Sequence, residues 1–359
     1  MTMKPVSGEK SSRKRFLSGT GFIPFIIRRL ITSVLLVFGV TFISFTITQL
    51  VPGDPVAANL GQSAYSDPVI VATFKKEFGL DQPVPVQYAK YVVKLLHGDL
   101  GVSLSSKRPV VQDLKEYFPA TLEIALVAVF LALVIGLLLG IISAVTRDRL
   151  PDQIIRVFSL TGVSMPAFWT ALTAFYLFFF VLGWAPGTGR LSPGADAPPT
   201  VTGLFTLDSL IAGDFATFRQ AFSYLLLPAV VLAIYAVGVL TRFTRASMLE
   251  ILGNDYVRAA RAKGLPEFTV IRRHVLRPAL LSIITVAGVA FASLLAGSVL
   301  VENVFSWPGL GQYAYRAAVG LDLPGIMGVS MVVATVYITM NLIVDILYRI
   351  IDPQMRELN

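Results

Sequence analysis

Few residues of this 359-residue chain have the chemistry or spacing of a catalytic or metal-binding site. There is no cysteine, which excludes thiolate nucleophiles and thiolate metal ligands, and His97 and His274 are too few to build a histidine metal centre. No Gly-x-x-x-x-Gly-Lys-Ser/Thr phosphate loop occurs, and we interpret the glycine-containing residues 186–190 as a turn that follows an apolar run. The sequence therefore predicts that this chain catalyses no reaction itself and binds no metal or cofactor of its own.

The segment from Asn254 to Pro266 predicts a short helix with a marked beginning and end. Asn254 or Asp255 can cap the helix N-terminus, and Gly264 suits the position just beyond its C-terminus. The residues between them are rich in alanine, a strong helix former with little side-chain bulk. A rigid helix of about two turns with small side chains fits a groove of another protein and can transmit a push to its neighbours. A passive basic surface helix explains these residues alone equally well. The candidate contact residues are Asp255, Tyr256, Arg258, Ala259, Ala260, Arg261, Ala262, Lys263 and Gly264.

The elements that must position this segment are membrane-spanning helices. Hydrophobic residues make up 55% of the chain and charged residues only 14%, against about 25% charged in soluble domains. Runs of about 20 apolar residues are continuous rather than alternating, which predicts helices and not barrel strands. We therefore expect an all-α polytopic membrane protein with about six spans. The predicted spans are Pro24–Leu50, Ala120–Val145, Ile155–Leu182, Tyr224–Leu240, Pro278–Val301 and Gly328–Ile350.

The positive charge is distributed unevenly between the predicted loops. With the N-terminus inside, the inner segments hold 20 of the 30 lysine and arginine residues, and the outer segments hold 10. Because positively charged loops stay on the cytoplasmic side, this bias predicts that both termini are cytoplasmic. The net charge of +8 is thus explained by orientation in a membrane rather than by nucleic-acid binding.

The spans divide the chain into a series of segments. The first span is too long for a secretory signal and is expected to remain as an anchor. Two helix-like stretches, Asp67–Phe78 and Val86–Leu96, lie in the first outer segment. The expected divisions are a basic cytoplasmic tail at 1–23, the first span at 24–50, an external segment at 51–119, a transmembrane core at 120–350 with a cytoplasmic loop at 242–277, and a cytoplasmic tail at 351–359.

The core of the cytoplasmic segment, Ala259-Ala260-Arg261-Ala262-Lys263-Gly264, with Arg277-Pro278 further on, resembles the coupling loop of ABC-importer permeases. Arg258 stands where that motif usually has glutamate, as in the dipeptide/oligopeptide/nickel branch. Other matching strings follow in order along the chain, from about residue 24 to 356. They are Pro52-Gly53-Asp54-Pro55, Phe78-Gly79-Leu80-Asp81-Gln82-Pro83, Gly98-Asp99-Leu100-Gly101, Pro119-Ala120-Thr121-Leu122-Glu123, Met165-Pro166-Ala167-Phe168-Trp169, residues 301–311, Asp345-Ile346-Leu347-Tyr348 and Asp352-Pro353.

This resemblance implies a MetI-like permease fold and a set of partners. Such a chain forms half of a transmembrane pathway and pairs with a homologous second permease. Two cytoplasmic ATPase subunits, which bind ATP and magnesium, dock on the coupling segments, and an external binding protein delivers the substrate. The implied location is the inner membrane of a prokaryote. The expected substrates are di- or oligopeptides, with nickel chelates, glutathione or oligosaccharides as alternatives.

A second set of candidate residues follows the fifth predicted span on the outer side. Glu302, Asn303, Phe305, Trp307 and Pro308 are expected to face the pathway mouth or the binding protein. Interfacial anchoring by tryptophan at a helix end explains them equally well. A stand-alone secondary transporter or channel is the main competing function, but such proteins often carry more charged residues within their spans.

Three local features have two interpretations each. Met165-Pro166 is expected to kink or restart the third span. Gly136 and Gly140 permit close helix packing, either within this chain or against a second permease. Asp345 is expected to pair locally with Arg349 on the last helix rather than to act in transport.

Overall fold

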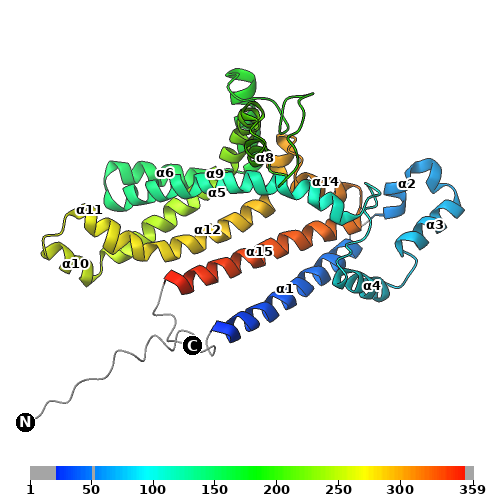
Figure 1. Ribbon diagram of the computed structural model, residues 1–359, viewed down its shortest axis with the longest axis horizontal. Coiled ribbons are helices and arrows are strands. Elements are labelled where there is room, and N and C mark those ends of the chain that lie inside the picture. Colours follow the sequence, from blue (N-terminus) through cyan, green and yellow to red (C-terminus); the bar gives the residue numbers. More distant parts are fainter. Residues whose placement is uncertain (1–21, 51–52, 352–359) are drawn as a thin grey trace, which may run out of the picture.

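The computed structural model describes residues 22–50 and 53–351, which form helices joined by short loops (Figure 1). The predicted tails at 1–23 and 351–359 lie almost entirely outside the described residues. Five described helices are long and apolar enough to cross a membrane, and a sixth crossing results if the bent pair at 150–181 is one span. The predicted all-α polytopic fold is confirmed. The helices are α1 (Phe22–Leu50), α2 (Pro55–Tyr65), α3 (Pro68–Phe78), α4 (Val84–Leu96), α5 (Val110–Val145), α6 (Leu150–Ser164), α7 (Ala167–Phe175), the π-helical η2 (Tyr176–Val181), α8 (Phe205–Ile211), α9 (Phe215–Leu252), α10 (Asp255–Ala262), α11 (Glu267–Thr269), the π-helical η3 (Val270–Leu276), α12 (Arg277–Gly297), α13 (Val299–Val304), α14 (Leu310–Val319) and α15 (Leu323–Ile351).

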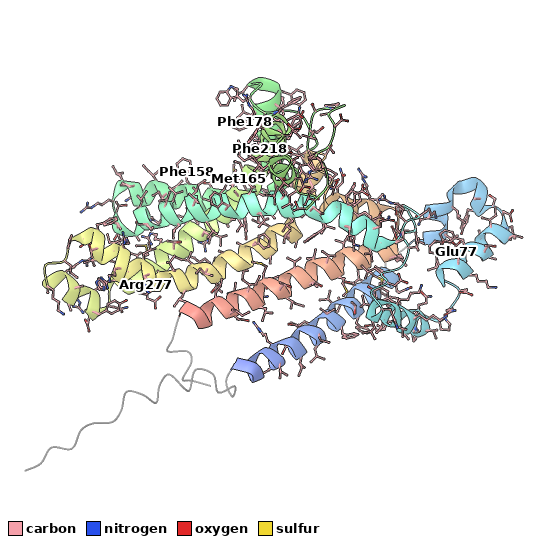
Figure 2. The ribbon with its side chains drawn as sticks, in the orientation of Figure 1. Glu77, Phe158, Met165, Phe178, Phe218 and Arg277 are labelled. Atoms are coloured by element: carbon pink, nitrogen blue, oxygen red, sulfur yellow. The ribbon has the colours of Figure 1, made fainter. Side chains whose placement is uncertain are left out.

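The long helices lie side by side in a fixed order (Figure 1). Helices α5 and α9 share the most extensive contact, α12 packs beside both, α15 packs on α12, and α1 packs on α15 at the edge. The short helices α2, α3 and α4 gather at one end of the bundle, and α10 and α11 gather at the opposite end. Glu77 and Arg277 mark these two ends in Figure 2.

Several predicted spans are longer in the structure than in the sequence pattern. Helix α5 begins at Val110 rather than Ala120, because Pro119 lies inside the helix and does not start it. Helix α9 extends the predicted fourth span at both ends and also contains a proline, Pro228. Proline is tolerated in such helices when neighbouring helices satisfy the freed backbone groups. Apolar composition therefore marked the centres of these helices but not their ends.

The third predicted span, Ile155–Leu182, is not one straight helix. Helix α6 ends at Ser164 and α7 begins at Ala167, and the two segments are bent by 101°. Met165 lies at the bend (Figure 2). The residue before a proline is disfavoured in helical geometry, and Met165 is accordingly extended with ψ at 128°. The expected break at Met165-Pro166 is confirmed, and its sharpness corrects the prediction of a continuous span.

Helices α2 and α3 start where the sequence places aspartate before proline. Asp54 and Asp67 each cap a helix by accepting a hydrogen bond from the backbone N–H two residues on, at 2.8 Å. The proline that follows occupies the first helical turn, where its missing N–H costs nothing. Gly79 ends α3 in a left-handed conformation with φ of 68°. The matching strings around Asp54 and Gly79 thus mark the ends of these short helices.

Gly136 and Gly140 bring α5 against α9 within the same chain. A Cβ atom on Gly136 would lie 2.8 Å from Cβ of Leu240, and one on Gly140 would lie 3.0 Å from the carbonyl oxygen of Thr241. Any larger side chain at either position would force these two helices apart. The structure therefore resolves the two interpretations in favour of packing within this chain.

Candidate functional site

The predicted short helix is present as α10, which spans Asp255–Ala262. Asn254 is the N-cap residue by backbone conformation, although its side chain makes no capping hydrogen bond. At the other end, Gly264 has φ of 77°. Its N–H donates to the carbonyl of Arg261 at 2.9 Å, and the N–H of Leu265 donates to that of Ala260 at 3.5 Å. This pair of bonds is a Schellman motif with glycine in the left-handed position.

One face of α10 is fixed to the transmembrane bundle. Val257 is fully buried and Ala260 nearly so, and both belong to the main apolar core. That core includes Met248 on α9 and Val270 and Val275 on η3, which leads directly into α12. Side chains of the same apolar core therefore come from α10, from α9 and from the η3 segment that continues into α12.

The opposite face of α10 is accessible. Tyr256 is 47% exposed, and the side chains of Ala259, Ala262 and Lys263 are also exposed. Arg258 pairs with Asp255 one turn before it, and Arg261 makes a two-bond pair with Glu267 at 2.7 and 3.1 Å. Because these pairs are exposed, they contribute little to stability, on the order of 0–1 kcal/mol. They do neutralise both arginines, so Lys263 is the cation of this face for which the structure gives no acidic partner among the described residues.

Helices α5, α6 and α9 all contact one buried carboxylate near their α10 ends. Asp152 of α6 is fully buried and accepts two hydrogen bonds from Arg245 of α9, both at 2.8 Å. Ser143 of α5 donates to it at 2.5 Å, and the backbone N–H of Asp148 donates at 3.0 Å. This two-bond pairing fixes the relative positions of α5, α6 and α9 near their α10 ends.

The outer candidate residues surround a second buried carboxylate. Glu302 of α13 is fully buried and accepts hydrogen bonds from Thr121 and Ser298 at 2.7 Å and from the N–H of Gln312 at 3.0 Å. Burial raises the pKa of its carboxyl, and the hydrogen bonds oppose that change only in part. A Cβ atom on Gly309 would lie 2.6 Å from the carboxylate oxygen Oε2. The glycines of the 301–311 string are therefore required by this close approach.

The same arrangement buries the neighbouring aromatic candidates. Trp307 is 1% exposed and its Nε1–H donates to the carbonyl of Ala120 at 2.8 Å. Phe305 is 2% exposed and makes an edge contact with Phe175. Asn303 bonds to its own helix, and Pro308 is half-buried. Glu302, Phe305 and Trp307 are buried, and two of them bond to Ala120 and Thr121 of α5, so these three side chains are not accessible to a partner in this conformation.

An adjacent ion pair escaped the sequence analysis. Arg190, interpreted only as part of a turn, is buried and pairs with Glu123 of α5 at 2.5 Å. Its guanidinium carbon lies 3.5 Å from the ring centroid of Phe205, and burial lowers its pKa despite the carboxylate. The long loop after η2 is thereby attached to α5.

Three of these ionic contacts join residues far apart in the chain. The pairs Asp152 with Arg245 and Glu123 with Arg190 span 93 and 67 positions, and no local pattern signals them. Asp345 likewise pairs with Arg29 of α1, a partner that the expected local pair on α15 did not anticipate. A charged residue inside an apolar run was the one available sign that Glu123 and Asp345 needed a partner.

Two family models of binding-protein-dependent transport systems match the chain. Residues 136–357 match the family described as "Binding-protein-dependent transport system inner membrane component", and residues 22–125 match the family described as "Binding-prot-dependent transport system membrane comp, N-term". A chain from the inward-facing MetNI methionine ABC transporter covers 65% of this chain and 93% of its own length, with 19% identity and a TM-score of 0.49.

Two curated relatives match nearly the whole chain. The probable D,D-dipeptide transport system permease protein of Escherichia coli K12 is 46% identical over 321 residues, which are 89% of this chain and 94% of that protein. The di/tripeptide transport system permease protein of Pseudomonas aeruginosa is 42% identical over 93% of this chain and 99% of its own. The chain therefore belongs to the inner-membrane components of binding-protein-dependent transport systems and is a multi-pass permease subunit of an ABC importer.

Proposed function

We propose that this chain forms half of the transmembrane pathway of a peptide importer and receives the force of ATP hydrolysis through α10. The observation that carries the proposal is the two-sided nature of α10. Its buried residues Val257 and Ala260 join it to α9 and η3, and its exposed face is short, rigid and rich in alanine. A cytoplasmic ATPase subunit that binds ATP and magnesium has in this face a surface suited to a groove.

The proposed orientation places α10 and both chain ends in the cytoplasm. The N-terminal end of α1 and the C-terminal end of α15 lie toward the α10 end of the bundle, and α2–α4 lie at the other end (Figure 1). The two-to-one excess of lysine and arginine in the α10-side segments supports the same orientation. The external unit α2–α4 then faces the side from which a binding protein delivers substrate.

In the proposed cycle, closure of two ATPase subunits moves α10 and reorients the helices packed on it. The partner that completes the pathway is a homologous second permease. A ligand shifts such an equilibrium only by its different affinity for the two states. Reversing a population from 1:99 to 99:1 requires about 5.5 kcal/mol, which ATP binding and hydrolysis can supply. The chain's own task in this cycle is mechanical, since α10 transmits movement to α9 and α12.

The docking of α10 can be tested with a single thiol, because the chain has no cysteine. Lys263→Cys places a unique thiol on the exposed face of α10, and Arg219→Cys places one near the outer end of α9 as a matched control. We expect a short thiol crosslinker in intact cells to capture a nucleotide-hydrolysing subunit from the first variant and not from the second. Failure of the first variant to capture that subunit, in cells with normal uptake, would contradict the assignment.

The substrate class is proposed from the relatives. Those matched over most of this chain are named for D,D-dipeptide, dipeptide and di/tripeptide transport. We expect deletion of the gene for this chain to abolish uptake of a radiolabelled dipeptide, and re-expression to restore it. An excess of unlabelled dipeptide should compete, whereas nickel chelate, glutathione or oligosaccharide should not. Competition by one of these three but not by dipeptide would replace the substrate and leave the α10 assignment intact.

A further inference from the structure

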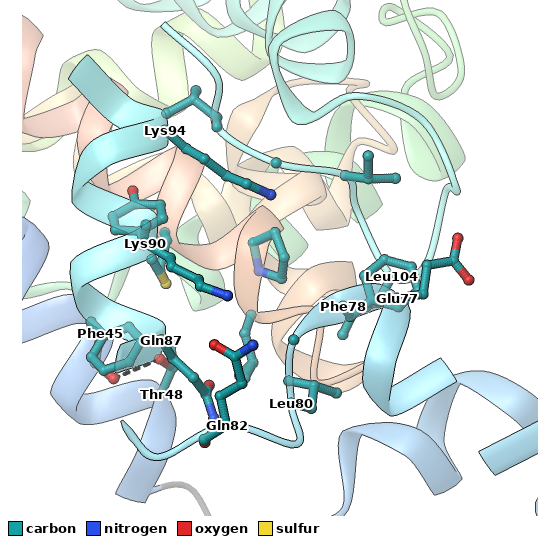
Figure 3. A pocket seen from close by; sticks show the side chains of 18 of the residues that line it. Phe45, Thr48, Glu77, Phe78, Leu80, Gln82, Gln87, Lys90, Lys94 and Leu104 are labelled. Atoms are coloured by element: carbon teal, nitrogen blue, oxygen red, sulfur yellow. Dashed lines mark hydrogen bonds between the residues drawn. The ribbon is translucent and has the colours of Figure 1, made fainter. Parts of the chain in front are cut away.

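The unit formed by α2, α3 and α4 contains a basic pocket at the end of the bundle away from α10. It has a volume of about 390 Å³ and lies between α1, α3, α4 and the start of α15. Three lysines line it, Lys76, Lys90 and Lys94, and none forms an ion pair with a described acidic residue. Figure 3 shows Lys90 and Lys94 reaching from α4 into the pocket, while the carboxylate of Glu77 points away from it. The pocket thus concentrates positive charge.

Two buried polar atoms at the same pocket lack a partner. The hydroxyl of Tyr91 and the Oε1 atom of Gln82 are shielded from solvent, and the described residues offer neither a hydrogen bond. Leaving such a group unpaired costs about 1–3 kcal/mol, so each is a place where a ligand gains affinity. Burial, and to a lesser degree Tyr88, raises the pKa of Tyr91 to about 12, which keeps the hydroxyl protonated as a donor. The Tyr91 hydroxyl and the three lysines are donors and suit a ligand with anionic oxygens, whereas the Oε1 atom of Gln82 is an acceptor and does not contribute to anion binding.

Helix α4 lies alongside the outer part of the first span rather than beyond its end. The ring of Tyr88 of α4 makes an edge contact with Phe42 and a tilted contact with Phe45 of α1, with centroids 5.5 and 5.2 Å apart, and its hydroxyl is 3.4 Å from that of Thr41. Thr41 precedes the end of α1 by roughly 13 Å at the usual rise per residue. A helix at that depth beside a membrane span lies at the boundary of headgroups and acyl chains.

The exposed face of α4 carries apolar side chains. Val86 is 42% exposed and Val93 is 56% exposed, and with Pro85 and Ala89 they line a shallow groove beside Lys90. Exposure of this apolar face to water is unfavourable, and contact with lipid acyl chains is favourable. Lysines next to an apolar helix face are the pattern of helices that bind the surface of an anionic membrane.

We propose that the pocket of Lys76, Lys90 and Lys94 binds the phosphate of an anionic phospholipid of the outer leaflet, whose acyl chains cover the apolar face of α4. The ammonium groups of the three lysines form ion pairs with the phosphate, and the Tyr91 hydroxyl donates a hydrogen bond to it. The lipid attaches α4 to the outer ends of α1 and α15, which are the helices at the edge of the bundle. This inference goes beyond peptide import and does not depend on the substrate.

The test is lipid retention by the purified importer complex in native mass spectrometry, with phosphatidylglycerol and phosphatidylcholine as probes. Lys90→Gln with Lys94→Gln removes two charges from the pocket, and Lys115→Gln with Arg219→Gln removes two exposed outer charges elsewhere. We expect the pocket variant to bind phosphatidylglycerol roughly tenfold or more weakly, and the control variant to match the unaltered complex. Lys90→Arg with Lys94→Arg should retain binding, and Tyr91→Phe should lose part of it.

Two outcomes would overturn the proposal. One is equal phosphatidylglycerol binding by the pocket variant and the control variant. The other is displacement of phosphatidylglycerol by a free dipeptide, which would make the pocket a substrate site. A failure of peptide import in cells has neither signature, so the lipid proposal and the proposed function fail separately.

Discussion

Replacing Gly264 with valine is expected to abolish peptide uptake while the chain still reaches the membrane at normal levels. Gly264 has φ of 77°, and its N–H closes the last turn of α10 by donating to Arg261. A β-branched residue in this conformation costs about 1–3 kcal/mol, and the helix end relaxes by unwinding. If the free energy of ATPase binding becomes weaker by only about 1.4 kcal/mol, the affinity for the ATPase subunit falls tenfold. Uptake, ATPase stimulation and membrane abundance are the measurements.

The substitution at Gly264 isolates the backbone because no neighbouring atom lies within 4 Å of the added Cβ position. Asparagine tolerates the left-handed conformation, so Gly264→Asn should retain most uptake, and alanine should fall between the two. Gly253→Ala is the matched control, since Gly253 has φ of −76°. Uptake that is equal in the valine and asparagine variants would show that the end of α10 does not determine coupling.

The boundaries of α10 were predictable because they depend on neighbouring residues. Asn254, the alanines and Gly264 each favour the same local structure, and the helix begins and ends where they place it. The charges of α10 were less predictable. Arg261 was a candidate contact residue, and its pairing with Glu267 of the next helix was not predicted. The spacing of residues within one helix does not reveal a partner that lies beyond the turn, on the following helix.

The outer cluster shows where residue type misleads. Glutamate and tryptophan at the end of an apolar run suggested an exposed contact surface, but Glu302 and Trp307 are buried between helices. The decisive contacts come from Thr121 and Ala120, which lie on a different helix far earlier in the sequence. The glycines at 309 and 311 were the one local sign of a close approach, and their meaning required a structure.

The helix ends were mispredicted for a related reason. The second span was predicted to begin at Ala120, directly after Pro119, but α5 continues through this proline; at Pro166 the expected break is present, and the chain turns sharply. The same residue type has opposite outcomes because packing of the surrounding helices decides whether the freed backbone groups are satisfied. Apolar length fixes how many helices cross the membrane, and tertiary contacts fix where each one ends.

Replacing Asp152 with asparagine is expected to destabilise the chain and uncouple α10 from the bundle. The substitution keeps the shape of the side chain but removes the negative charge that faces Arg245 in two hydrogen bonds. Breaking a buried ion pair from one side costs about 3–5 kcal/mol, and the 20% exposure of Arg245 reduces this toward the lower value. The thermal midpoint of the purified complex should fall by roughly 5 °C or more.

The cause of that loss can be separated from a general defect by a second substitution. If the unpaired cation is responsible, Asp152→Asn with Arg245→Met should recover more than half of the lost midpoint, because a neutral pair leaves no charge behind. Asp148→Asn alters an exposed acid in the same turn, whose φ of 62° asparagine tolerates, and should shift the midpoint by little. If the double variant recovers its thermal midpoint but not its uptake, the chain is stable and still does not transport. That result would assign the pair of Asp152 and Arg245 to the transmission of movement. A double variant no more stable than Asp152→Asn alone would show that the carboxylate acts through Ser143 and the backbone of Asp148 instead, and the unpaired charge of Arg245 would not explain the loss of stability.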